Sequence, residues 1–448
     1  MTAPAPSRES FLLRRSHTAT PPGGRLLVVL FLLYLAVGKG FAYFGYPPLF
    51  IGEVSLAVMF VLAVRPHIVL PTGLAPAIAT LFVLAGTAQL INDVLFSTTP
   101  KLETLRGFAI VYYASFAVLA HALLAESERR VGFTGTVARV EAAISRASWP
   151  MLASLGVLTL RLVFQSIPSP NWPGSGIPLL YTKSTDVSVA LAFLLPFIAD
   201  RSRRNIAYSR LQSATWIACT LLVTARSRAG VIAIALSILI TFGIRARYVI
   251  RGIFITVIGY LALLVSGIAI RAGSRELSAR GLRDSVIAVV DPSAASDGSF
   301  AGTTRWRTNW WKAIWSDVES RGMWFRSNGW GTNLAAKYLA PDSVPSTAFT
   351  TLRLPHSTFF SIAGRAGVAA AVLYLLIPAT TFITSQRSWV QQRSSPLLRS
   401  LQITLLGGVA VGLTDVYIES PQGGIVFWCC CGSLWWWTRR RPQPIAEA

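Results

Sequence analysis

The chain has 448 residues, of which 53% are hydrophobic and 13% charged, and its mean hydropathy is +0.53. A soluble protein of this length does not need so much apolar sequence to fill its core, so the composition excludes a soluble globular protein and favours an integral membrane protein. The formal net charge of +22 would suit nucleic-acid binding, but the distribution of the basic residues gives another reason for it.

Apolar runs recur along the whole chain, and about twelve of them are long enough to be predicted as spans of a bilayer core of roughly 30 Å. The sequence therefore predicts an all-α polytopic membrane protein, with nine spans in residues 25–270 and three in residues 357–438. The predicted spans are 26–46, 49–64, 69–91, 107–125, 149–167, 187–199, 208–225, 229–244, 250–270, 357–382, 398–414 and 424–438.

The basic residues alternate between the connections of these spans. With the N-terminus in the cytosol, every second connection is rich in Arg and the short ones between are nearly free of basic residues, as the positive-inside rule requires. Both ends are then cytosolic, with a disordered Pro-, Ser- and Thr-rich tail at 1–24 and a short tail at 439–448. Most of the positive charge thus indicates topology and contact with anionic membrane lipids, and no nucleic-acid partner is expected.

Two polar segments interrupt the apolar pattern. Residues 126–148 are predicted to form a cytosolic interfacial helix, and residues 271–356 one large extracytoplasmic loop containing short helices. Within that loop, "RWRTNWWKAIWSD" (305–317) spaces its tryptophans about one helical turn apart, as in a helix that lies in the headgroup layer. "SNGWGTN" (327–333) is typical of a Gly-bounded turn. A loop of this length usually carries a lid or a binding site.

The cysteines and the outer acidic residues give no sign of a metal site. All the cysteines fall in predicted spans, where packing is their simplest role; they are Cys219, Cys429, Cys430 and Cys431. The outer acidic residues are widely separated in the sequence; they include Asp93, Glu103, Asp186, Asp415 and Glu419. The sequence therefore predicts chemistry without a metal or a cofactor.

Only one histidine faces outward in this topology. His17 and His67 are cytosolic, and His121 lies within the fourth predicted span. His356 stands directly before the tenth span, at the membrane surface, where an imidazole can act as a base near neutral pH. The alternative is a structural role, in which His356 caps the following helix or bonds a neighbour.

Arginines supply positive charge on the same outer side. Arg226 and Arg228 lie in the very short connection between the seventh and eighth spans, where the positive-inside rule disfavours them, so an anionic ligand is the simplest explanation. Guanidinium groups bind phosphate oxygens through paired hydrogen bonds, which suits the pyrophosphate of a lipid carrier. Ordinary phospholipid headgroups are the alternative ligand. The other arginines expected there are Arg305, Arg307, Arg353 and Arg365.

Two further basic residues lie in the outer halves of predicted spans, Lys39 in the first and Arg161 in the fifth. A charge within a span is costly and commonly functional, so both residues are candidates for substrate binding. Snorkelling of their long side chains to the outer interface is the alternative.

The motifs of one region resemble those of a known family. An "SRAG" start to a span is followed by "RTNWWKAI", by "GWGTN" and then by "PHSTFF" and "GRAGVAAAVLYLL". In order and spacing this set is similar to the O-antigen ligase family and to the related polysaccharide polymerases, over about a third of the chain, from Thr224 to Ile377. The resemblance implies a GT-C-type glycosyltransferase of the cytoplasmic membrane. Such an enzyme moves a glycan from a polyprenyl-pyrophosphate carrier to a hydroxyl of a glycan or glycolipid acceptor on the outer face.

The resemblance also implies roles for individual residues. Arg228 matches the arginine of an "SRG"-like motif and Arg307 an arginine four residues before Trp, and both would stabilise charge on the leaving pyrophosphate. His356 matches the histidine of an "HN" motif, although Ser357 replaces the Asn here, and would accept the proton of the attacking hydroxyl or orient it. Arg305 competes with Arg307 for the loop position. The residues expected to bind substrate are Arg226, Arg305, Arg353, Arg161 and Lys39.

Other functions stay open at this level. A polysaccharide polymerase would extend the lipid-linked glycan with the same donor and the same residues. A transporter or flippase for lipid-linked glycans usually shows paired halves and broken spans near mid-membrane, and neither is clear in this chain. A scaffold of an envelope assembly would not require the outer arginines to converge.

Overall fold

The structure, a computed structural model, describes most of the chain and shows an almost wholly helical fold in that part. The described residues are 22–46, 49–63, 69–204, 206–243, 261, 265, 267, 270–272, 275–277, 299–339, 353–389 and 395–439. Most of the predicted ninth span and of both tails lies outside them. The strands form two short antiparallel hairpins: β1 (Gly45–Tyr46) with β2 (Leu49–Phe50), and β3 (Ile270–Ala272) with β4 (Arg275–Leu277).

The helices up to residue 243 account for the first eight predicted spans. They are α2 (Pro22–Val37), α3 (Lys39–Ala42), α4 (Ile51–Ala63), α5 (Leu74–Phe96), α6 (Lys101–Tyr112), α7 (Ser115–Val163), α8 (Ser184–Arg203), α9 (Ser209–Thr224) and α10 (Arg228–Phe242). The described helices after residue 298 lie within the predicted large loop and the last three predicted spans. They are α13 (Ser299–Arg321), α14 (Leu334–Tyr338), α16 (Thr358–Ala366), α17 (Val368–Trp389), α18 (Pro396–Gly412) and α19 (Pro421–Thr438).

Several of these helices are apolar enough to cross a bilayer. Within the described residues, three helical stretches meet both the length and the composition of a span: Leu74–Phe96, Lys101–Val163 and Val368–Gln386. Shorter apolar helices lie at Gly23–Val37, Ile51–Leu62, Arg228–Phe242 and Pro396–Gly412. These helices fit a membrane protein, whereas the number of about twelve spans stays a prediction.

Local sequence explains where the helices begin. The side chain of Ser227 accepts a hydrogen bond from the amide of Gly230 at 3.0 Å, and so caps α10. Ser395 caps α18 in the same way through Leu398 at 3.2 Å. Short polar side chains at these positions satisfy amides that have no partner inside the helix. In α18 and α19 a Pro occupies the first helical position, where its missing N–H costs nothing.

The centre of the bundle is α8. Its side chains are buried from Thr185 to Ala199, on every side of the helix, as expected for a helix surrounded by others. It packs against α10 and α18, which also contact each other, while α7 packs against α19 and α5 against α17. The cysteines are free and buried in α9 and α19, in keeping with the packing role that the sequence predicts.

Three predicted segments are divided differently in the structure. The first predicted span, 26–46, ends at Val37 and restarts as α3 after Gly38, whose φ of 65° favours glycine. The fourth, 107–125, is split between α6 and α7 around Tyr113 and Ala114. The predicted interfacial helix 126–148 is not a separate element, because α7 consists of two helices that meet at Gly132, whose φ of 73° is not helical: residues 126–131 end the first helix, and residues 133–148 begin the second, which continues to Val163.

The tenth predicted span, 357–382, is likewise two helices, since α16 ends where α17 begins. Between them Gly367 has a φ of 98°, and a Cβ there would come within 3.0 Å of the backbone of residues 324–326. Only glycine fits both the conformation and the space. Apolarity alone does not reveal this break, because both helices are apolar and the glycine between them is one residue.

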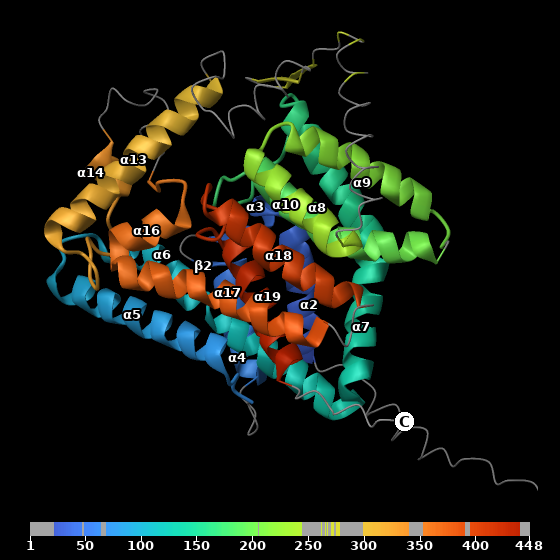
Figure 1. The fold of residues 1–448 in the computed structure, drawn as a ribbon, viewed down its shortest axis with the longest axis horizontal. Coiled ribbons are helices and arrows are strands. Elements are labelled where there is room, and N and C mark those ends of the chain that lie inside the picture. The colour runs from blue at the N-terminus through green and yellow to red at the C-terminus, as the bar shows by residue number, and fades with distance from the viewer. Residues whose placement is uncertain are drawn as a thin grey trace, which may run out of the picture.

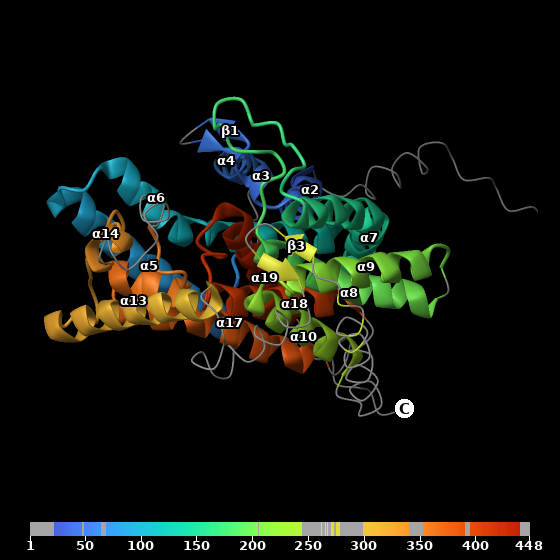
Figure 2. The same cartoon turned by 90° about the horizontal axis from the view of Figure 1, so that it is seen from above.

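Helices from distant parts of the chain gather at one end of the bundle. In both overall views α6, α13 and α14 lie together at this end, beside one end of α5, and α16 is next to them in Figure 1 (Figures 1 and 2). The predicted "GWGTN" turn is confirmed, with Gly329 at a φ of 99°. It attaches this end to α5, because the indole of Trp330 donates to the carbonyl of Gly86 at 3.0 Å and its amide to Asp93 at 2.6 Å.

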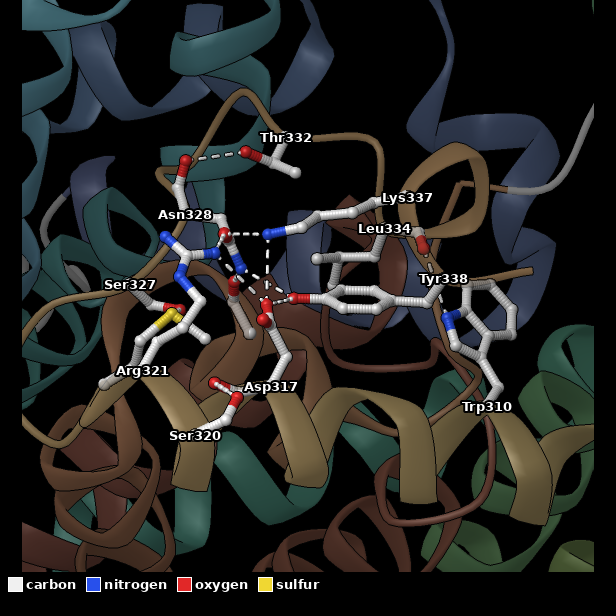
Figure 3. Close-up of polar contacts among 12 residues, drawn as sticks. Trp310, Asp317, Ser320, Arg321, Ser327, Asn328, Thr332, Leu334, Lys337 and Tyr338 are labelled. Carbon is white, nitrogen blue, oxygen red and sulfur yellow. Dashed lines mark hydrogen bonds and ion pairs between the residues drawn. The ribbon is translucent and has the colours of Figure 1, made fainter. Parts of the chain in front are cut away.

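A polar network holds α13 to α14 in the same end. Lys337, Arg321 and Tyr338 all direct their side chains to the carboxylate of Asp317, and Asn328 lies in the centre of the group (Figure 3). The indole of Trp310, which the sequence predicts in a helix of the headgroup layer, donates instead to the carbonyl of Leu334 at 3.2 Å and is buried. Part of the Trp-rich face therefore packs inside the protein.

Candidate functional site

Polar side chains from two distant parts of the chain meet on Asp415, in the segment that follows α18. Its Oδ1 lies 3.1 Å from Nδ1 of His356 and accepts a hydrogen bond from Nζ of Lys183, also at 3.1 Å. Its Oδ2 accepts a hydrogen bond from the hydroxyl of Thr185 at 3.2 Å. The amide of Val416 donates to Oδ1 at 2.8 Å and orients the carboxylate. We call these residues the Asp415 cluster.

The chain holds His356 in an unusual backbone conformation. Its φ of 53° is in the left-handed region, which residues other than glycine rarely adopt and which is frequent at functional sites. The indole of Trp311 donates to the carbonyl of Pro355 at 2.7 Å and fixes the preceding residue. The imidazole meets the ring of Trp306 edge to face, with 5.7 Å between centroids. These contacts from α13 position the imidazole before α16 begins.

Arg307 is anchored beside the same carboxylate. Its Nη1 donates to the carbonyl of Thr414 at 3.0 Å, and its guanidinium lies 5.6 Å from the ring centre of Trp306. Two of the predicted catalytic residues, Arg307 and His356, are therefore brought to adjacent residues of one segment. This segment, 413–420, also carries Asp415, which no sequence pattern linked to them.

The charges of the cluster determine which proton is where. Burial lowers the pKa of His356, and the positive charge of Arg307 lowers it further. The hydrogen bond with Asp415 raises this pKa, but not enough to bring it back to the usual value. Burial alone would raise the pKa of Asp415, but the hydrogen bond from His356 and the charge of Lys183 hold it well below its usual value. A neutral imidazole thus donates Nδ1–H to an ionised Asp415. Its Nε2 keeps a lone pair that can accept a proton.

Lys183 stays positively charged in this setting. Burial would lower its pKa, but the carboxylates of Asp415 and Asp186 outweigh this effect and raise it. Lys183 is also the residue that precedes α8, whose first turn carries Thr185. One helix start therefore supplies two of the donors to Asp415.

Lys39 and Arg161 converge just before Lys183. The Nζ of Lys39 lies 3.5 Å from the hydroxyl of Tyr181 and 4.6 Å from the centre of its ring. The guanidinium of Arg161 donates to the carbonyl of Leu180. Both candidates thus contact the segment that leads into the Asp415 cluster. Lys39 does so from the start of α3, directly after the break at Gly38.

The other predicted arginines are placed separately. Arg226 donates to the carbonyl of Leu162 at the end of α7, and Arg353 forms an ion pair with Glu103 of α6. Arg228 is the first residue of α10, whose first turn packs on that of α8. Arg365 is buried and donates to the carbonyl of Thr332. Arg305 falls on α13, but its side chain lies outside the described part of the structure.

Sequence reasoning missed the partners of His356. In the sequence Asp415 is one of several widely separated outer acids, yet its carboxylate joins His356 to Lys183 across 59 and 232 residues. Lys183 carries a signal that is present in the sequence, because it is a basic residue on the predicted outer side, like Arg226 and Arg228. Among the described residues, no group of three or more His, Cys, Asp or Glu side chains could hold a metal ion.

The fold and the site define a helical membrane protein with a cationic, histidine-containing polar site at one end of its bundle. Residues 213–375 match the family model described as O-antigen ligase, which confirms, over that part of the chain, the resemblance seen in the motifs. The matched region contains Arg228, Arg307 and His356 but ends before Asp415. No match was found among curated proteins.

Proposed function

We propose that the protein is a membrane glycosyltransferase that moves a glycan from a polyprenyl-pyrophosphate carrier to an acceptor hydroxyl at the outer face of the cytoplasmic membrane. The observation that carries the proposal is the arrangement of His356 and Arg307 on residues 414–415, inside a chain that matches the O-antigen ligase family. A neutral imidazole next to a fixed guanidinium suits a reaction that removes a proton and releases an anionic leaving group.

The reaction begins with the acceptor hydroxyl. Its oxygen attacks the anomeric carbon of the donor sugar, and the bond from that carbon to the pyrophosphate oxygen breaks. The electron pair of that bond leaves with the lipid pyrophosphate, whose charge Arg307 and Arg228 neutralise. The hydroxyl proton passes to Nε2 of His356, and Asp415 stabilises the resulting imidazolium through Nδ1–H. The imidazolium later gives this proton to the leaving pyrophosphate or to water, which restores the neutral base.

The proposed role of Arg228 rests on the packing of its helix and not on a contact of its side chain with the Asp415 cluster. A Cβ on Gly230 would come within 2.3 Å of the hydroxyl of Ser188, so the first turns of α10 and α8 are in close contact. Arg228 therefore begins a helix next to the helix start that carries Lys183 and Thr185. Arg226, Arg305, Arg353, Arg161 and Lys39 remain proposed substrate-binding residues.

The activity test uses single substitutions in membranes that contain the lipid-linked donor. His356→Ala should lower transfer by about 10²- to 10⁴-fold, the usual contribution of a general base. Arg307→Gln and Arg228→Gln should lower it at least as much, because stabilisation of developing charge is commonly the larger contribution. Arg326→Gln is the matched control, since Arg326 is an exposed arginine of the same loop. Full activity of the His356 variant would contradict the proposal.

The pH dependence gives an independent test. Because the pKa of His356 is lowered from 6.5, the base form should persist to mildly acidic pH, and activity should fall only below that value. Arg307→Gln removes a positive charge that lowers this pKa, so the acid limb of its residual activity should move to higher pH. An acid limb above pH 6.5 in the unaltered protein would exclude His356 as the base in this form.

Product analysis separates the remaining candidates. Longer glycans on the polyprenyl carrier would indicate a polymerase, and glycan on a new acceptor a ligase. Movement of lipid-linked glycan across vesicles without a new glycosidic bond would indicate a transporter. The transferase is favoured because its chemistry requires a base and anion-binding groups together, as the Asp415 cluster and Arg307 provide.

A further inference from the structure

The ammonium of Lys183 has more hydrogen-bond donors than the described residues accept from it. An ammonium has three N–H donors. Within the described part of the chain, one of them is bonded, to Oδ1 of Asp415 at 3.1 Å. The carboxylate neutralises one positive charge, but Arg307 is anchored at the adjacent Thr414 and His356 is neutral. Asp186 supplies a second carboxylate next to Lys183, so what the group around Asp415 has to spare is the hydrogen-bond donors of the ammonium.

The side chain of Lys183 is also more accessible than those of His356 and Asp415. The side chain of Lys183 is 29% exposed, compared with 17% for His356 and 14% for Asp415. A lysine with a purely structural ion pair gains nothing from this exposure, whereas a ligand-binding lysine requires it. Because His356 and Lys183 contact the same oxygen, an anion bound to the ammonium would lie beside the imidazole.

The surroundings of Lys183 favour an anion. The residue stands at the start of α8, a helix of 20 residues, where the backbone amides and the helix dipole attract negative charge. Lys39 adds a second ammonium at Tyr181, two residues earlier in the chain. Asp186 of the same helix start is influenced by both ammonium groups; its Oδ2 accepts a hydrogen bond from the amide of Lys183 at 3.3 Å, and its Oδ1 has no hydrogen-bond partner among the described residues.

We propose that Lys183 is a direct ligand of a phosphoryl group of the lipid diphosphate and holds it beside His356, in addition to Arg307. The inference rests on the proposed function, because it takes the bound anion to be the diphosphate of the carrier. Lys183 lies outside the region that matches the family model, and its role is assigned from the contacts of the Asp415 cluster. It acts by binding and positioning and takes no part in proton transfer.

Binding of inorganic pyrophosphate to the purified full-length protein in nanodiscs tests the proposal without turnover. Lys183→Met should weaken the affinity about 10-fold or more, the usual effect of removing one charged hydrogen bond. Lys183→Arg keeps the charge and should bind within about threefold of the unaltered protein. Arg307→Gln should also weaken binding, and the exposed Arg326→Gln control should not.

A second measurement separates an anion ligand from a purely structural ion pair. NMR titration of histidine-labelled protein should show that Lys183→Met raises the pKa of His356, because a nearby positive charge is lost. A raised pKa together with unchanged pyrophosphate affinity would overturn the inference and leave the proposed function standing, provided that Arg307→Gln still weakens binding. Pyrophosphate affinity that neither Lys183→Met nor Arg307→Gln changes would count against both proposals.

Discussion

Two carboxylates organise the polar end of this protein, and they differ in where their partners come from. Asp317 accepts hydrogen bonds from Arg321, Lys337 and Tyr338, all within 21 residues of it in the chain. These partners belong to α13 and α14, and they staple one helix to the next (Figure 3). The ion pairs are partly exposed, with the side chain of Arg321 52% accessible.

Asp415 instead joins its own segment to two others that are far from it in the chain. His356 is 59 residues away, Thr185 is 230 and Lys183 is 232. Its side chain is 14% exposed, compared with 20% for Asp317, and its partner His356 is 17% exposed, so the difference in burial lies mainly in the partners. One of these partners is a titratable imidazole. Around Asp317, acidic and basic side chains thus form a local network between neighbouring helices, called the staple below. Around Asp415 they form a site from distant parts of the chain. Partner distance, burial and a neutral base distinguish the site from the staple, and the number of ion pairs does not.

Asp415→Asn is expected to give the largest effect. An amide in place of the carboxylate can donate to Nδ1 and so favour the imidazole tautomer with its proton on Nε2, which cannot accept another. Transfer activity should fall by about 10²- to 10⁴-fold. The assay is glycan transfer in membranes at matched protein amounts, and the matching control is Asp317→Asn. Equal losses in both variants would remove the distinction between site and staple.

Trp330→Ala tests how the region of Asp317 is attached to the bundle. The indole is 1% exposed and donates to Gly86, so its removal leaves a cavity and an unsatisfied carbonyl next to α5. The free energy of unfolding should fall by about 3–5 kcal/mol, measured by denaturant unfolding in mild detergent. Trp324→Ala is the control, because Trp324 is 46% exposed and should change stability little. If the two variants were equally stable, the turn would not anchor this end.

Glu419, four residues after Asp415, should make stability depend on pH. Burial raises the pKa of Glu419 from 4.5 to about 7, although the charge of Arg365 opposes this. The folded state then keeps the proton to higher pH than the unfolded chain. The stability that this carboxyl contributes is complete below pH 4.5 and is lost as the pH rises towards 7.

Glu419→Gln removes this dependence. Between about pH 5 and pH 8 the unaltered protein should lose roughly 2 kcal/mol more stability than the Gln variant, as denaturant unfolding at both pH values would show. Parallel losses in the two proteins would mean that Glu419 is ionised throughout this range. In that case Glu419 would be ionised in the folded protein, as Asp415 is.

Asp317→Asn should give the smallest effect. Its ion pairs are partly solvated, and such pairs contribute about 1 kcal/mol or less. We expect a small decrease in the thermal midpoint of unfolding and glycan transfer within about threefold of the unaltered protein. A loss of activity comparable to that of Asp415→Asn would show that the staple positions the site and is not independent of it.

The sequence is sufficient for the helical character, for the resemblance to the O-antigen ligase family over part of the chain, and for most of the residues now proposed to act. Apolar runs predict helices because length and composition are local properties, and α10, α18 and α19 follow the predicted spans closely, whereas α5 begins and ends five residues later than predicted. The motif around His356 and the arginine pair at Arg226 and Arg228 are short, contiguous patterns, so the resemblance can be seen without the folded structure. The breaks at Gly38 and Gly367 were missed, because both interrupt segments that are apolar on either side.

The packing of α8, α10 and α18 decided which acid and which lysine belong to the site. Five outer carboxylates are alike in sequence, and none is near His356 along the chain. Only when α18 packs on α8 does the segment after it bring Asp415 to Lys183 and Thr185, and the same segment then meets His356 and Arg307. Composition and motifs act over a few residues, whereas a site of this kind depends on contacts that close long loops. For that reason only the folded chain could reveal it.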